Sequence, residues 1–144
     1  MSAPPSQVCT FTLHERLFAL DVAGVRSVLP WQPVRRVPRA PEMIEGLMNL
    51  RGEIVMAVDL RVALGLPKRE ADARPMSVVV ASAGGLVGLL VDRVGDVEEP
   101  DPESWEPITA LPVQRDQALI AGAFKTPEGL VLLLDSAALV ALCS

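Results

Sequence analysis

The stretch from residue 49 to residue 61 reads NLRGEIVMAVDLR and combines a tight turn, a short apolar strand and a terminal acid. Gly52 gives the backbone the conformational freedom that a tight turn needs. Arg51 lies just before it and presents a planar head with five N–H donors, which suits carboxylates and backbone carbonyls. Residues 54–58 have the length of a buried strand, and Asp59 is placed to cap a helix that follows. The stretch predicts a binding corner and contains no recognisable catalytic group.

The composition favours a strand-rich protein without a nucleic-acid partner. Of its 144 residues, 50% are hydrophobic, which is enough for one domain or for two small lobes that share a core. Aromatic residues make up only 3% and Tyr is absent, so we expect an aliphatic core rich in the β-branched side chains that favour strands. A net charge of -5 argues against the clustered positive charge of a nucleic-acid-binding surface.

From the sequence we expect neither a signal peptide nor a membrane anchor. Residues 1–7 form a Pro-containing leader that we expect to be flexible, and they lack the positive-then-apolar pattern of a signal peptide. The longest apolar runs, 130–134 and 137–143, are too short to span a bilayer. Cys9 and Cys143 lack the spacing of a metal site or a disulfide framework, so we interpret both as core residues. The sequence predicts a cytoplasmic protein with no metal, no cofactor and no direct membrane insertion.

The first half of the chain alternates predicted strands with short helical segments. Residues 8–13 and 17–20 are expected to form a hairpin around a turn at 14–16. The other expected elements are a short helix or turn at 22–29, a brief strand at 34–37, a helix at 42–47 after Pro41, a strand at 54–58 and a helix at 60–64. The charged segment 68–74 lacks periodicity, and we interpret it as an exposed loop that joins two lobes.

The second half is expected to repeat the strand pattern. Its predicted elements are strands at 76–81 and 86–91 around a turn of small residues at 83–85, further strands at 92–97, 119–124 and 130–134, an acidic surface excursion at 98–107 and a helix at 136–142 capped by Asp135. We therefore expect a single domain over 8–144. Within it, lobe 1 covers about 8–67, lobe 2 covers about 75–135, and the final helix packs back on them.

A series of apolar and glycine-containing motifs runs from about Cys9 to Leu142. The motifs are Phe18-Ala19-Leu20-Asp21-Val22 with Val25 and Val28, Val37-Pro38, Ile44-Glu45-Gly46-Leu47, Asn49-Leu50-Arg51-Gly52, residues 54–60, Val87-Gly88-Leu89-Leu90-Val91-Asp92 and Ile120-Ala121-Gly122-Ala123. Their order and spacing resemble the CheW-like domain family. That family includes the coupling protein of bacterial chemotaxis and the regulatory domain of its histidine kinase.

The resemblance implies both a fold and a function. The implied fold is mainly β, with two small five-stranded SH3-like β barrels packed side by side, short helices and no active site. The implied function is that of an adaptor that joins the cytoplasmic tip of a chemoreceptor to the regulatory domain of a CheA-type histidine kinase. Such an adaptor is cytoplasmic and is recruited to membrane-bound receptor arrays.

The resemblance also implies residues for two partner-binding surfaces. By similarity, the receptor-binding residues are Val25, Ser27, Val28, Asn49, Arg51 and Gly52, and the kinase-binding residues are Val87, Leu89 and Val91. An interior position is the alternative for the last three, because they alternate along an apolar strand. Many relatives carry an acid where this chain has Ser27. Its absence would weaken a charged contact with a partner, whereas Trp31 nearby offers an apolar anchor.

The candidate residues also have ordinary structural interpretations. Arg51 could brace the corner by pairing with a carboxylate such as Glu42, Glu45 or Asp59, and Asn49 and Gly52 could simply shape the turn.

Three acids, Asp59, Asp92 and Asp135, each follow an apolar strand. We interpret them as helix caps or turn acceptors, because no nucleophile or base accompanies them. The sole histidine, His14, lies in a predicted turn, and no residue of the chain is predicted to be catalytic.

The leading hypothesis is therefore a non-enzymatic signalling adaptor. A second hypothesis keeps the fold but makes the chain a divergent member that binds the receptor and caps or tunes the array without engaging the kinase. A third, from a different class, is a small-molecule-binding or hydrolytic β domain that uses Asp59 or Asp92 and requires a pocket around them.

Overall fold

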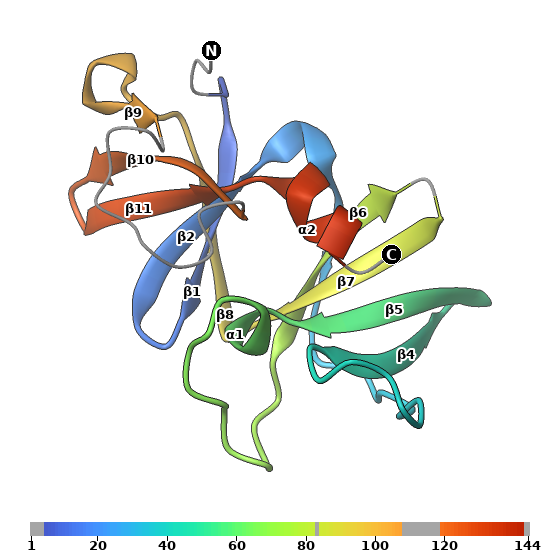
Figure 1. Ribbon diagram of the computed structural model, residues 1–144. Helices are drawn as coiled ribbons and strands as arrows, with labels where there is room; N and C mark the ends of the chain where they lie inside the picture. Colours follow the sequence, from blue (N-terminus) through green and yellow to red (C-terminus); the bar gives the residue numbers. More distant parts are fainter. Residues whose placement is uncertain (1–4, 83, 108–118, 143–144) are drawn as a thin grey trace.

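The computed structural model describes residues 5–82, 84–107 and 119–142 and is a mainly β structure with two sheets (Figure 1). Sheet A has the strand order β8-β1-β2-β11-β10-β9, formed by β1 (Val8–Leu13), β2 (Arg16–Asp21), β8 (Arg93–Glu98), β9 (Glu106–Pro107), β10 (Ile120–Thr126) and β11 (Gly129–Leu134). Sheet B has the order β3-β6-β7-β5-β4, formed by β3 (Val25–Leu29), β4 (Ile44–Leu50), β5 (Glu53–Asp59), β6 (Met76–Ser82) and β7 (Gly85–Val91).

The helical segments are short. They are α1 (Leu60–Ala63), α2 (Ser136–Leu142) and 3-10 turns at Val22–Gly24 and Pro102–Ser104. The predicted two-part β fold with short helices is confirmed, although sheet A gains a sixth strand from the two-residue β9. No helix among the described residues is long and apolar enough to cross a membrane.

The two sheets divide the chain differently from the predicted lobes at 8–67 and 75–135. The β1–β2 hairpin belongs to sheet A together with strands from residues 93–134, whereas β6 and β7 belong to sheet B. Two parallel pairings create this arrangement, β2 with β11 and β5 with β7. Parallel partners lie far apart in sequence, and the apolar alternation of a strand does not say which distant strand it will join.

A segment predicted to be a short helix or turn and a segment predicted to be a helix both form strands over most of their length. Only Val22–Gly24 is helical in the segment 22–29, and Val25–Leu29 forms β3 at the edge of sheet B. The helix predicted at 42–47 is replaced by β4, which pairs with β5. Both segments are short and apolar, so pairing with a neighbouring strand overrides their helix-like spacing. The strand predicted at 34–37 is reduced to a single bridge between Arg35 and Leu47.

The local hairpins follow the sequence closely. β1–β2 and β4–β5 each turn through two residues that both have positive φ, namely His14 (51°) and Glu15 (65°), and Arg51 (53°) and Gly52 (89°). Positive φ at both central residues is the requirement of a type I′ turn, which matches the twist of the flanking strands. Three of these four residues are not glycine, so contacts outside the turns must help to hold them.

A shared hydrophobic core joins the two sheets. Sheet A contributes Phe11, Leu13, Phe18, Leu20 and Leu134, sheet B contributes Val58, Val78, Val80, Val87, Leu89 and Val91, and the helices contribute Leu60 and Leu139. Each fully buried side chain of this size contributes about 1.5–3 kcal/mol of transfer free energy. The helix predicted at 136–142 is confirmed, and through Leu139 it packs on this core.

The charged segment that was predicted to join the two lobes does not connect the two sheets. Residues 66–75, here called the connector loop, link α1 to β6 and so remain on the sheet B side. Most of the segment 68–74 is exposed as predicted, but the Arg69 side chain is only 11% exposed. The pattern of apolar residues along the sequence cannot predict ion pairs, and ion pairs are what anchor this segment.

Candidate functional site

The tip of the β4–β5 hairpin presents Arg51 to solvent. Asn49 closes the turn, since its Oδ1 accepts a hydrogen bond of 2.9 Å from the Gly52 backbone N–H. Arg51 is exposed, and within the described residues it forms no ion pair or side-chain hydrogen bond. The carboxylates of Glu42 and Asp59 pair instead with residues of the connector loop. A free guanidinium on a rigid turn is available to a partner carboxylate or backbone carbonyl.

An exposed isoleucine lies beside this arginine. Ile54, directly across from Asn49 in the hairpin, is 59% exposed. Sequence reasoning placed it inside a buried strand, although Val55 next to it is fully buried and Ile54 therefore points to the other face. The tip thus combines a cationic and an apolar side chain, which is a common composition for protein contact residues.

The other predicted receptor-binding residues lie on β3. Val25 is half-buried, Ser27 is exposed and Val28 is 38% exposed. β3 and β4 occupy opposite edges of sheet B with three strands between them. The predicted residues thus fall into two groups, here called the β3 patch and the β4–β5 tip, on strands that do not pair with each other.

A further exposed apolar residue was not found from the sequence. Val97 on β8 is 57% exposed, and β8 is an edge strand of sheet A. β6 pairs with β3 and also contacts β8, so edge strands of both sheets meet at β6. Nothing in the sequence distinguishes Val97 from the other apolar residues of its predicted strand, so its exposure was not predicted.

The predicted kinase-binding residues on β7 are in the core. Val87 is 5% exposed, and Leu89 and Val91 are fully buried. β7 is paired on both edges, with β6 and with β5, and its apolar face packs into the core shared by the two sheets. Side chains in this position cannot form a surface contact, so the alternative interior interpretation applies.

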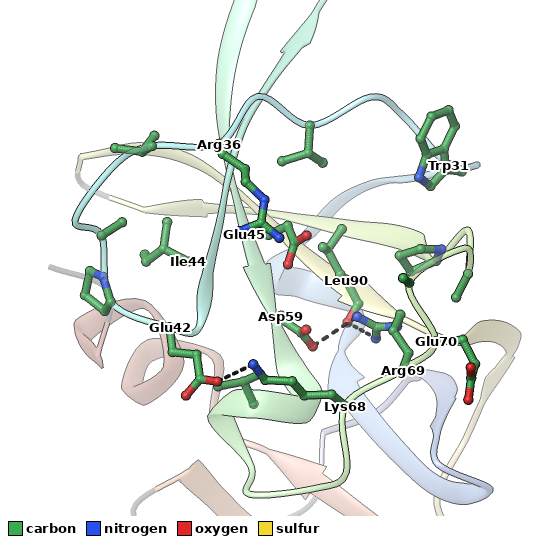
Figure 2. A pocket seen from close by; sticks show the side chains of 18 of the residues that line it. Trp31, Arg36, Glu42, Ile44, Glu45, Asp59, Lys68, Arg69, Glu70 and Leu90 are labelled. Atoms are coloured by element: carbon green, nitrogen blue, oxygen red, sulfur yellow. Dashed lines mark hydrogen bonds and ion pairs between the residues drawn. The ribbon is translucent and has the colours of Figure 1, made fainter.

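A cavity of about 770 Å³ lies between residues 31–45 and the connector loop (Figure 2). None of the predicted receptor-binding residues lines it. Lys68 pairs with Glu42 at its edge, and Arg69 pairs with Asp59 at 3.0 Å on its floor. The connector loop is thus linked to β5 of sheet B through Arg69 and to the segment before β4 through Lys68.

Trp31 lines the cavity and contacts the far end of the connector loop. The Arg74 guanidinium lies 4.4 Å from the centroid of the Trp31 ring, which is a cation–π contact. Trp31 is 38% exposed. One face of the Trp31 ring is therefore covered by Arg74.

The three acids that follow apolar strands act as hydrogen-bond acceptors, as predicted. Asp59 caps α1 through a bond from the Arg61 backbone N–H, and Asp135 accepts from the Ala138 backbone N–H at the start of α2. Asp92 accepts from the His14 backbone N–H at 2.7 Å. Among the described residues no cluster of acids, histidines and cysteines could hold a metal, and no buried side-chain polar atom lacks a hydrogen-bond partner.

Asp92 is also the centre of an ion cluster. Arg61 binds it through Nε at 3.1 Å and Nη2 at 2.5 Å, and Arg69 binds it through Nη2 at 3.2 Å. Burial alone would raise the pKa of Asp92, but the hydrogen bonds from Arg61, His14 and Arg69 outweigh it and lower the pKa below its ordinary value. The hydrogen bond to Asp92 is the main cause that raises the pKa of Arg61. Asp92 is therefore ionised at neutral pH and accepts four hydrogen bonds from three residues.

The depressed pKa of Asp92 predicts a pH-dependent contribution to stability. At pH 7 the Asp92→Asn substitution should lower the free energy of unfolding by about 1.5 kcal/mol, a typical cost for hydrogen bonds to a charged group. The difference between the two proteins should persist down to the ordinary carboxyl pKa and then shrink as the pH falls through the lower pKa of the folded state. Urea unfolding of both proteins between neutral and acidic pH measures this. A difference that grows on acidification would contradict it.

Known proteins match nearly the whole chain. A family model described as the CheW-like domain matches residues 7–143. "Probable chemotaxis protein CheW" of Rhizobium etli is 26% identical over 92% of this chain and 86% of that protein. "Chemotaxis protein CheW" of Klebsiella aerogenes is 29% identical over 87% of this chain and 75% of that protein.

A solved structure supports the same relationship. The crystal structure of the scaffolding protein TtCheW from Thermoanaerobacter tengcongensis is 33% identical, covers 92% of this chain and 90% of that chain, and matches with a TM-score of 0.80. The structural match extends across both sheets, and the family model covers the hairpin tip, β3 and the Asp92 cluster. This chain belongs to the CheW-like domain family.

Proposed function

We propose that this chain is a non-enzymatic adaptor of chemotaxis-type signalling that joins a chemoreceptor tip to the regulatory domain of a CheA-type histidine kinase. The observation that carries the proposal is the family match over residues 7–143, with relatives that are named chemotaxis proteins and a solved relative described as a scaffolding protein. The engaged state of Asp59 and Asp92 adds support, since both carboxylates are occupied by arginines.

Receptor recognition is assigned to the two exposed patches. The β4–β5 tip offers the Arg51 guanidinium and Ile54, on a turn shaped by Asn49 and Gly52. The β3 patch offers Val25, Ser27 and Val28 along a strand edge. The two patches lie on strands that do not pair with each other, so each can be changed without altering the backbone pairing of the other. Variants in each patch therefore report on separate contacts.

Kinase recognition requires a surface other than β7. Exposed apolar patches often mark sites that partner proteins cover, and sheet A presents Val97 on β8 and Leu130 near the start of β11. We assign the kinase contact to sheet A, so that each sheet serves one partner. Each contact would be modest, and recruitment to a membrane-bound array would come from many such contacts acting together.

Binding measurements with each partner alone test the assignment. The purified chain is titrated with a receptor cytoplasmic fragment and, separately, with the kinase regulatory domain. Adaptor function predicts that both bind, that Val28→Asp weakens only the receptor, and that Val97→Asp weakens only the kinase domain. Binding of the receptor without the kinase domain would identify a capping member of the family, and binding of neither would remove the proposal.

A further inference from the structure

Asp92 occupies the point at which the chain passes from one sheet to the other. It is the single residue between β7 of sheet B, which ends at Val91, and β8 of sheet A, which begins at Arg93. With no loop at this crossing, the backbone at one residue sets the direction of β8 relative to β7. The Asp92 backbone N–H donates to the Thr12 carbonyl oxygen at 3.1 Å, which ties the crossing to β1.

The carboxylate of Asp92 extends this tie in both directions. On the sheet A side it accepts the His14 backbone N–H in the β1–β2 turn. On the sheet B side it is bound by Arg61 of α1 and Arg69 of the connector loop. Arg61 also donates to the Pro67 carbonyl, and Arg69 also pairs with Asp59 at the end of β5. One side chain therefore holds a sheet A turn, a sheet B helix and the connector loop together.

The turn held by Asp92 has a conformation that needs support. His14 and Glu15 both have positive φ, at 51° and 65°, and neither is a glycine. Non-glycine residues populate this region sparsely and keep it where surrounding contacts determine the backbone. The hydrogen bond from His14 to Asp92 is such a contact, and it joins the turn to the sheet crossing.

We infer that Asp92 is a positioning residue that fixes the orientation of sheet A relative to sheet B. The shared hydrophobic core attracts the two sheets, but apolar burial is not directional. The two hydrogen bonds from the Arg61 guanidinium to the Asp92 carboxylate have a defined planar geometry, so they can fix an orientation that apolar burial does not. The functional consequence of this inference rests on the proposed adaptor function. If each sheet binds one partner, the angle between the sheets determines how the kinase is oriented relative to the receptor.

The orientation is measured directly by the distance between two spin labels, one on each sheet. Exposed positions for the labels are Lys125 on β10 of sheet A and Ala81 on β6 of sheet B, each changed to Cys in a Cys143→Ser background. The native Cys9 is buried, and burial raises the pKa of its thiol, so it stays unlabelled. Asp92→Asn is the test variant. Asp135→Asn is the matched control, since Asp135 also follows a strand but caps α2 alone.

The inference predicts that Asp92→Asn broadens or displaces the distance distribution while Asp135→Asn leaves it unchanged. If Asp92→Asn does not fold, Arg69→Gln removes one of the three donor residues and should produce a smaller change of the same kind. An unchanged distribution in a folded variant of this cluster would overturn the inference, because the core alone would then set the orientation.

A functional readout separates positioning from simple stability. Asp92→Asn should leave the affinity for each isolated partner within about twofold, because no residue of the cluster is among those assigned to the partner contacts. Receptor-dependent activation of the kinase in the assembled complex should fall at least about fivefold, the lower range of coupling between sites. If the parent chain bound neither partner, the adaptor function would fail, while the distance measurement would still decide the role of Asp92.

Discussion

Replacing Gly46 with alanine is expected to lower the free energy of unfolding by about 3 kcal/mol, the largest stability effect that we predict for a single methyl group. A Cβ at Gly46 would lie 2.2 Å from the Arg35 carbonyl oxygen, 2.7 Å from the Arg35 carbonyl carbon and 2.8 Å from Val34 Cγ1. Real Cβ atoms do not approach backbone atoms this closely. The Gly46 φ of 155° adds strain for any residue that carries a side chain.

The backbone around Arg35 cannot move aside without loss. Arg35 and Leu47 exchange two backbone hydrogen bonds of 2.8 Å each, and these are what fasten the segment before β4 to sheet B. Relief of the clash would break them at about 1 kcal/mol each. Urea denaturation measures the effect, with Gly84→Ala as the control, because nothing lies within 4 Å of a Cβ at that glycine. A loss below about 1 kcal/mol for Gly46→Ala would show that the segment 34–35 is not fixed as described.

Replacing Arg51 with alanine is expected to weaken binding of the receptor fragment about 30-fold, which corresponds to about 2 kcal/mol and is typical of an arginine at the centre of an interface. The side chain is exposed and forms no ion pair or side-chain hydrogen bond within the described residues, so its removal costs the free protein no such interaction. Alanine faces the same positive φ that arginine already adopts at 53°. The free energy of unfolding should therefore change by less than about 0.5 kcal/mol.

A matched arginine gives the control for this binding measurement. Arg39 is also exposed and also has a positive φ, at 67°, but it lies in the loop before β4 and not at the hairpin tip. Arg39→Ala removes the same charge from the same kind of backbone and should leave receptor affinity within about twofold of the parent. Equal losses for the two variants would mean that net charge, and not the Arg51 site, governs the interaction.

The sequence was most informative about local structure. The turn at His14, the Arg51-Gly52 corner, the cap at Asp59 and the final helix after Asp135 all depend on neighbouring residues and were found where predicted. The membership of the two sheets was not predictable in this way, because the parallel pairings of β2 with β11 and of β5 with β7 join residues far apart in sequence.

In the candidate site, too, local features were predictable and long-range features were not. The exposure of Arg51 and the turn-closing role of Asn49 follow from the short motif itself. Whether an apolar strand residue faces solvent depends on what covers it, so Ile54 and Val97 were missed and Leu89 was assigned to a surface although it is fully buried. The Asp92 cluster joins β7, α1, the connector loop and the β1–β2 turn, and no local pattern records such a convergence.

Co-sedimentation of the three components tests adaptor function most directly. A receptor cytoplasmic fragment assembled on vesicles is mixed with the kinase regulatory domain, with and without this chain, and the vesicles are collected. We predict that the kinase domain sediments with the receptor only when the chain is present, and that Arg51→Ala reduces this recruitment while Arg39→Ala does not. A chain that sediments with the receptor but never brings the kinase domain with it would contradict the account.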